Sequence, residues 1–111
     1  MKRYLDCNAS DLANITKSDL LYSIQSSEGR IIISETIGTV QPVLVSITNA
    51  EFAASQGADI LLLNLFDVNN PVINGLPSEI KPKDYIKKLK SLTGRPIGIN
   101  LEPVAPGFEK T

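Results

Sequence analysis

Three short apolar segments of the chain each end in polar residues, and stretches with helical character separate them. The segments cover residues 31–35, 60–64 and 97–102. Continuous apolar runs of this length are typical of parallel strands that are covered on both faces. We therefore predict an α/β fold whose parallel sheet has three strands, at 30–37, 59–65 and 96–101.

Helix signals precede each predicted strand, which gives the order α-β-α-β-α-β. Residues 1–29 form a helical lead-in, in which Thr16 or Ser18 can cap a helix and Gly29 supplies a left-handed stop. A second helix begins at Thr48, because Glu51 stands three positions later, at the spacing of a capping box.

The third helix is predicted from the proline and the glycine that bracket its apolar stripe. Pro82 suits a first helical turn, and Gly94 suits the end of the helix. Ile86, Leu89 and Leu92 mark the face expected to be buried. The sequence thus predicts one domain over residues 1–111, with a βαβαβ unit over 30–111.

Two stretches between these elements are expected to be loops. Segment 42–47 is apolar and could pair with the first strand as a hairpin, but Pro42 argues against a central strand and favours a loop. Segment 66–81 is rich in Asn, Pro and Gly, and loops of this length in compact domains tend to be functional or disordered.

Composition excludes several classes of mechanism and partner. The 111 residues carry a net charge of −1, so nothing attracts the chain to nucleic acid or to an anionic membrane. The absence of histidine rules out Ser-His, Cys-His and His-metal mechanisms within this chain. A single cysteine, Cys7, excludes an internal disulfide and fits a reducing cytoplasm. It is expected to be an inert thiol, with a role near the barrel mouth or in redox sensing as the alternative. No apolar run approaches the ~20 residues that span a bilayer.

Polar side chains stand where the predicted strands end. They are Glu35, Asn64, Asp67, Asn100 and Glu102. Because α/β proteins place their chemistry at the carboxyl ends of parallel strands, these groups are expected to converge. Carboxylate and amide oxygens suit a hard cation such as Mg²⁺, which could polarise a small oxyacid. The alternative is that each residue only caps a loop.

Four short stretches of the chain are informative when they are taken in order. They are Glu35-Thr36, Asn49-Ala50-Glu51-Phe52-Ala53, Gly57-Ala58-Asp59-Ile60 and Arg95-Pro96-Ile97-Gly98-Ile99-Asn100-Leu101-Glu102-Pro103. Together they resemble the opening of the phosphoenolpyruvate mutase and isocitrate lyase superfamily. The resemblance implies a TIM-type barrel that makes or breaks C–C or C–P bonds at α-keto acids through Mg²⁺.

The resemblance also implies roles for the residues at the strand ends. Asn100 and Glu102 stand where that superfamily has its metal-associated Asp pair, and Asp67 could join them as a third metal ligand. Asn64 stands near the strand-two position that contacts substrate, and Glu35 with Asn64 would orient a small oxyacid substrate.

Chain length limits what these residues can do alone. A closed (β/α)₈ barrel needs ~250 residues, and three strands leave both sheet edges unpaired. We therefore expect the chain to be the N-terminal part of a longer mutase-like enzyme, inactive alone, or to form a homo-oligomer. The alternative is a non-catalytic, self-assembling α/β module.

A run of basic residues lies outside this scheme. It contains Lys81, Lys83, Lys87, Lys88, Lys90 and Arg95. Asp84 lies three and four positions before Lys87 and Lys88, which is the spacing of neighbours on a helix surface. The run is therefore interpreted as a solvated helix face, with phosphate binding as the alternative.

Overall fold

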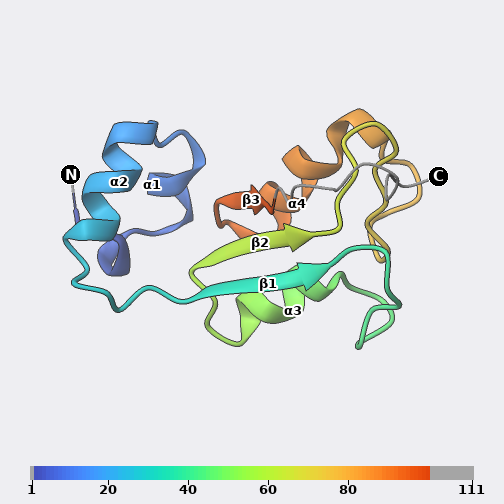
Figure 1. The fold of residues 1–111 in the computed structure, drawn as a ribbon, viewed down its shortest axis with the longest axis horizontal. Helices are drawn as coiled ribbons and strands as arrows, with labels where there is room; N and C mark the ends of the chain where they lie inside the picture. The colour runs from blue at the N-terminus through green and yellow to red at the C-terminus, as the bar shows by residue number, and fades with distance from the viewer. Residues whose placement is uncertain (1, 101–111) are drawn as a thin grey trace, which may run out of the picture.

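A computed structural model describes residues 2–100 as a three-stranded sheet with helices on one side and a helical unit at one end (Figure 1). The helices are η1 (Tyr4–Asp6), α1 (Ala9–Ala13), α2 (Lys17–Gln25), α3 (Asn49–Ser55), η2 (Pro82–Asp84) and α4 (Tyr85–Thr93). The strands are β1 (Ile33–Ile37), β2 (Ile60–Asn64) and β3 (Ile97–Ile99).

All three strands are parallel, and they lie in the order β1-β2-β3. The register places Glu35 beside Leu62, and Leu62 beside Gly98. The backbone N–H of Asn100 donates to the Leu63 carbonyl (2.9 Å), so hydrogen bonding to β2 continues one residue past β3. The predicted parallel sheet and the predicted order of helices and strands are confirmed.

The core lies between one face of the sheet and the two crossover helices. Leu61 and Leu63 of β2 point to this side and are 0% and 1% exposed, and they pack with Ala50 of α3 and Leu89 of α4. Alanines on α3 let that helix approach the sheet closely, as small residues permit. Within residues 2–100, no helix packs on the opposite face, which is turned toward the viewer in Figure 1.

The sequence prediction is wrong about the burial of the first strand. Ile32 and Ile33 are 58% and 59% exposed, although an isoleucine run suggested cover on both faces. The strand also begins at Ile33 rather than at residue 30. The physical reason is position: β1 is an edge strand, and the described residues cover only one face of the sheet.

The helix-start signals are confirmed in their chemistry. The Thr48 hydroxyl accepts from the Glu51 N–H (3.0 Å), and the Glu51 carboxylate accepts from the Thr48 N–H (3.2 Å), which completes the capping box. The Thr16 hydroxyl caps α2 by accepting from the Asp19 N–H (3.2 Å).

The helix ends differ from prediction in two places. Gly94 closes α4 in the left-handed conformation, as expected. Gly29 is also left-handed, but α2 ends four residues before it, at Gln25. Leu92 is 40% exposed and so lies outside the buried stripe of α4, because the sheet that α4 covers is only three strands wide.

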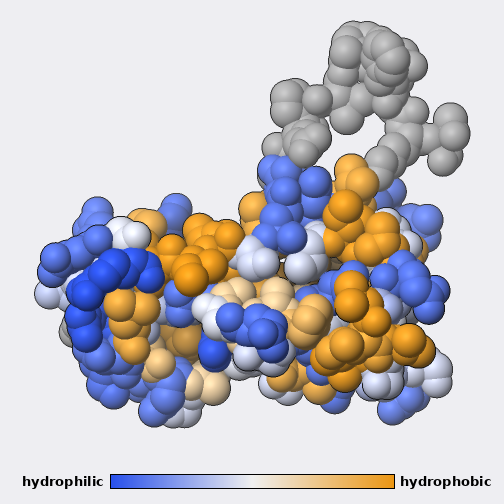
Figure 2. All heavy atoms as spheres, turned by 90° about the horizontal axis from the view of Figure 1, so that it is seen from below, coloured by the Kyte–Doolittle hydropathy of each residue, from blue (hydrophilic) through white to orange (hydrophobic). Residues whose placement is uncertain are grey.

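Two long loops meet at the carboxyl end of the sheet. Asn74 joins them: its backbone N–H donates to the Gly38 carbonyl (2.8 Å) and its Nδ2 donates to the Thr39 carbonyl (3.0 Å). Segment 42–47 is a loop, as preferred, and its Val43 and Val45 are 68% and 71% exposed. One hydrophobic area of the surface accordingly lies at the right of Figure 2, the end at which the strands finish.

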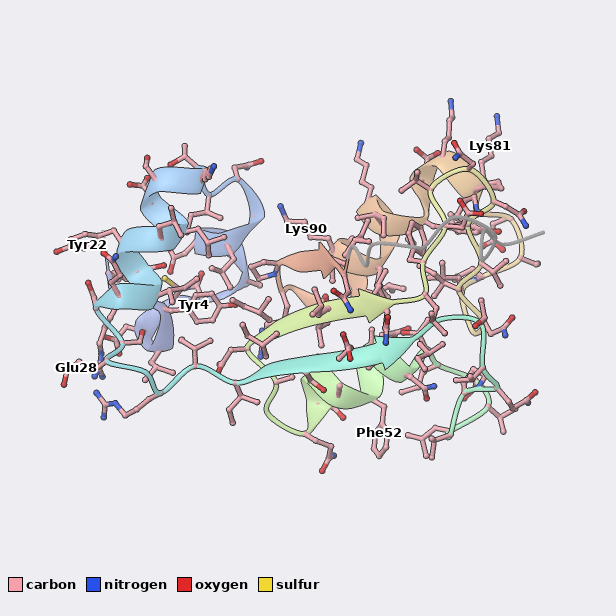
Figure 3. All side chains as sticks on the ribbon, in the orientation of Figure 1. Tyr4, Tyr22, Glu28, Phe52, Lys81 and Lys90 are labelled. Atoms are coloured by element: carbon pink, nitrogen blue, oxygen red, sulfur yellow. The ribbon has the colours of Figure 1, made fainter. Side chains whose placement is uncertain are left out.

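The N-terminal helical unit lies beyond the amino end of the sheet. The Tyr4 hydroxyl donates to the carbonyl of Asp59, just before β2, and the Lys90 ammonium donates to the Ala13 carbonyl (3.0 Å) (Figure 3). η1 and α1 are helices that sequence reasoning did not resolve within the lead-in. Among the described residues, no helix is long and apolar enough to cross a membrane.

Candidate functional site

Three of the five residues predicted at the strand ends meet on the uncovered face of the sheet. The Asn100 Nδ2 donates to Glu35 Oε2 (3.3 Å) and to Asn64 Oδ1 (3.4 Å). We call Glu35, Asn64 and Asn100 the polar cluster. One residue comes from each strand or its immediate end, as convergence at the carboxyl edge requires.

The strand register explains why these three side chains share a face. Ile37 of β1 pairs with Asn64, so Glu35 lies two residues before the level of Asn64 and points to the same side. Glu35 is therefore in the middle of β1 and not at its end. Asn100 follows β3 and reaches back to both neighbours.

The end of β2 holds Asn64 in place through a tight backbone turn. Asn64 Oδ1 also accepts from the Leu65 N–H (2.9 Å), and Leu65 has a φ of 57°, in the left-handed region that a leucine rarely adopts. Such strain persists only where surrounding structure enforces it, and it is common beside functional sites. In the part of the chain that is described, the Asn64 Nδ2 carries no hydrogen bond, so it can donate to a ligand.

Asp67 lies in the loop after β2 and is held by its own turn. Its Oδ1 accepts from the Asn69 N–H (2.9 Å), and its carbonyl accepts from the Asn70 N–H (3.1 Å). No hydrogen bond between residues 2 and 100 links it to the polar cluster. Its role as a metal ligand stays a prediction, and Glu102 lies outside the described residues.

The polar cluster offers a hard-oxygen donor set with one carboxylate. Over residues 2–100, no three acidic or cysteine side chains gather in a group that could enclose a metal. Glu35 contributes the carboxylate, whereas Asn64 Oδ1 already accepts hydrogen bonds from the Leu65 N–H and the Asn100 Nδ2. Mg²⁺ commonly takes one or two protein carboxylates and keeps several waters, so Glu35 is the described side chain that could hold such an ion.

An apolar cavity of about 350 Å³ opens near the same edge of the sheet. Its lining includes Phe66 and Val68 after β2, Ile86 of α4 and Ile99 of β3. Sequence reasoning missed Phe66. The available signal was its position, since a large apolar side chain directly after a strand end is placed to line a cavity at that edge.

Cys7 stands apart from the polar cluster, in the N-terminal helical unit. Its thiol donates to the Arg3 carbonyl (3.6 Å), and partial burial, aided by the nearby Asp11, raises the pKa of the thiol. A raised pKa disfavours the reactive thiolate. The geometry is that of the inert thiol expected from the sequence.

Comparison with protein families identifies the chain. The model of DUF7916, a domain of unknown function, matches residues 5–111. The chain belongs to the DUF7916 family. No curated protein and no solved structure matches it.

Proposed function

We propose that this DUF7916 chain supplies part of a binding site for a small oxyacid at the carboxyl edge of an incomplete TIM-type barrel. The observation that carries the proposal is the polar cluster, in which side chains from three parallel strands join through the Asn100 amide. A loop-capping role needs no contact between strands. Here the Asn100 side chain bonds to side chains of the two other strands, from residues that lie 65 and 36 positions away in the sequence.

The cluster can recognise an oxyacid through its amide donors. The free Nδ2 of Asn64 can donate to a carboxylate oxygen of the ligand. Glu35 has the opposite effect on an anion, because its exposed carboxylate repels a negative ligand unless a cation lies between them. The Asn100 amide orients Glu35 from the strand side.

A bound Mg²⁺ would relieve this repulsion and polarise a carbonyl or carboxylate of the ligand. Glu35 is the described carboxylate that would hold it, with Asp67, Asn100 and Glu102 as the further ligands that the sequence predicts. The phosphoenolpyruvate mutase-like reaction, a C–C or C–P bond lyase or mutase step on an α-keto acid, is part of the same proposal. It would belong to the completed barrel in the cytoplasm.

The uncovered face of the sheet supports the proposal of a barrel. In a (β/α) barrel, helices cover the outside of the parallel sheet and the inner face carries the site at its carboxyl end. α3 and α4 lie on one face, and the polar cluster lies on the other. Ile33 and Leu62, which share that face, would then point into the barrel interior.

The test is a thermal-unfolding titration of the full chain with Mg²⁺ and with oxalate, separately and together. We expect Tm to rise most with both ligands, because the cation relieves the repulsion between Glu35 and the anion. Glu35→Gln should abolish the joint effect. Glu28→Gln is the matched control, because Glu28 is an exposed glutamate in the N-terminal unit, far from the strands' carboxyl ends (Figure 3).

The two variants separate a site from general charge effects. If Tm fails to rise with both ligands present, or if Glu35→Gln and Glu28→Gln respond alike, the proposed oxyacid site is wrong. Asn64→Ala provides a second measure, since loss of the free amide donor should weaken oxalate while it leaves the response to Mg²⁺ alone largely unchanged.

A second candidate function, a non-catalytic assembly module, rests on the exposure of β1. Ile33, the first residue of the edge strand β1, and Ile32 directly before it are more than half exposed. An unpaired edge with exposed apolar side chains is a template for pairing with another chain. Light scattering coupled to size-exclusion chromatography tests it. A homo-oligomer that Ile33→Lys dissociates supports assembly, and a monomeric wild type excludes it.

A further inference from the structure

A cavity of about 520 Å³ lies along the outer side of η2 and α4, away from the polar cluster. Four lysines line it, together with two acidic residues: Lys81, Lys83, Lys87, Lys88, Glu79 and Asp84. We call it the lysine groove. Lys81 marks its place at the rim of the molecule in Figure 3, and α4 turns its other face to the core through Leu89.

None of these lysines is neutralised by a partner in the described part of the chain. The two ion pairs found over residues 2–100 are Lys2–Asp11 and Arg3–Asp6, both in the N-terminal unit. Asp84 has the spacing to pair with Lys87 and Lys88, yet no ion pair joins them. Four ammonium groups and two carboxylates leave the groove with an excess of two positive charges.

The excess is local, because the chain as a whole carries a net charge of −1. Four of its eleven basic residues are gathered on this one cavity. A solvated helix face needs no hollow and gains nothing from unpaired like charges, which repel one another. A concave surface that brings unpaired positive charges together instead favours the binding of an anion.

The direction of the helix adds to the attraction between the lysine groove and an anion. Pro82 occupies the first turn of η2, which runs directly into the nine-residue α4, and Lys81 precedes this turn. The groove begins at the amino end of this helical segment, where the helix dipole favours negative charge, and it extends along α4 to Ser91. Lysine ammonium groups act as point charges that suit phosphate oxygens.

We propose that the lysine groove binds a small ligand that carries two or more phosphate groups. The cavity is larger than one phosphate needs, and its four ammonium groups come from residues spread over positions 81–88, which favours a ligand with more than one anionic group. The two carboxylates on its wall disfavour a long polyanion such as DNA, which would lie against them as well. This site is independent of the oxyacid site and does not require it.

The test is an isothermal titration of the full chain with inorganic pyrophosphate and, separately, with orthophosphate. At about 0.15 M ionic strength, attraction between exposed charges is screened beyond about 8 Å, so binding there requires close contact. We expect pyrophosphate to bind more tightly than orthophosphate. In NMR spectra recorded with pyrophosphate, the amide chemical shifts of residues 79–91 should change.

A matched pair of double variants locates the site. Lys83→Gln with Lys87→Gln removes two charges from the groove, and we expect pyrophosphate affinity to fall by about tenfold or more, as expected for lost charge-assisted hydrogen bonds. Lys2→Gln with Lys17→Gln removes the same charge from the N-terminal unit and should leave affinity unchanged. Glutamine and lysine have similar helix propensities, so α4 should persist in both proteins.

Three results would overturn the proposal. They are no pyrophosphate binding at this ionic strength, equal weakening by the two double variants, and displacement of pyrophosphate by duplex DNA at equal phosphate concentration. The last result would mark the groove as a general polyanion surface.

Discussion

β2 has two faces whose side chains lie in very different surroundings. Leu61 and Leu63 are 0% and 1% exposed against α3 and α4, whereas Leu62, between them, is only half-buried on the uncovered face. Three consecutive leucines thus divide between a packed core and a surface. The difference shows that the apolar residues of this strand do not all serve the core, because Leu62 lies on the face that no described helix covers.

The uncovered face is also the one that carries polar chemistry. Glu35, Asn64 and Asn100 lie on it, and the helix-covered face has no comparable group among the core residues that pack there. A face that combines apolar side chains near the amino end with hydrogen-bonding groups near the carboxyl end is what the interior of a barrel needs. Experiments can test whether the two faces of the sheet differ in this way.

The largest expected effect is at Leu61. Leu61→Ala should lower the free energy of unfolding by about 3 kcal/mol, because it empties a fully enclosed position. Leu62→Ala makes the same chemical change on the uncovered face and should cost about 1 kcal/mol, since less surface is buried there. Urea unfolding of both variants measures the difference. Equal losses would mean that the second face is also covered in solution, and the comparison would fail.

A smaller effect is expected at the start of α3, the helix that covers the core face. Thr48→Ala should lower the free energy of unfolding by about 1.5 kcal/mol, because Thr48 is 1% exposed and its hydroxyl completes a capping box. Thr16→Ala removes a cap from α2, outside the core, and should cost about 0.5 kcal/mol.

This pair of threonines sharpens the comparison, because the chemical change and the cap position are the same. Guanidinium unfolding should rank Thr48→Ala below Thr16→Ala in stability. The reverse order would indicate that the N-terminal unit contributes more to cooperative folding than the packing of α3 on the sheet.

Much of the fold could be predicted because its signals are local. The capping box of Thr48 and Glu51 and the left-handed end at Gly94 depend only on nearby residues. The parallel sheet followed from short apolar runs separated by helices. The exposure of Ile32 and Ile33 could not be predicted. Whether their side chains are buried depends on how many strands and helices lie beside them, and no local sequence pattern encodes that number.

The site could be predicted in part for the same reason. Convergence of Asn64 and Asn100 followed from strand ends that share a direction, whereas Glu35 joins them from the middle of β1 because it lies on the same face. Residues in the loops were harder to assign. The Asp67 carboxylate accepts a hydrogen bond from the Asn69 N–H in its own turn. This contact depends on the geometry of the loop and not on the register of the strands. Phe66 escaped notice because an apolar residue after a strand carries no chemical signature.

An effect smaller than those at Leu61 and Thr48 is expected at the amino end of the sheet, where Tyr4 attaches the helical unit to β2. Tyr4 is 4% exposed and its hydroxyl donates to the Asp59 carbonyl, so Tyr4→Phe should cost about 1 kcal/mol at neutral pH. Burial raises the pKa of the Tyr4 hydroxyl well above its usual range. The folded state therefore keeps the proton to higher pH than the unfolded state does.

The pH dependence follows from this difference. Below the unfolded-state pKa of about 10, the stabilising contribution of neutral, buried Tyr4 is fully present. As the pH rises above 10, the unfolded state releases its proton first, and wild-type stability falls, whereas the phenylalanine variant has no such proton to lose. Urea unfolding at a series of pH values from 7 to about 11 should show the gap between the two proteins shrinking above pH 10. A gap that stays constant would mean that the Tyr4 hydroxyl is open to water, and that the N-terminal unit is attached to the amino end far more loosely than α3 and α4 are attached to the covered face.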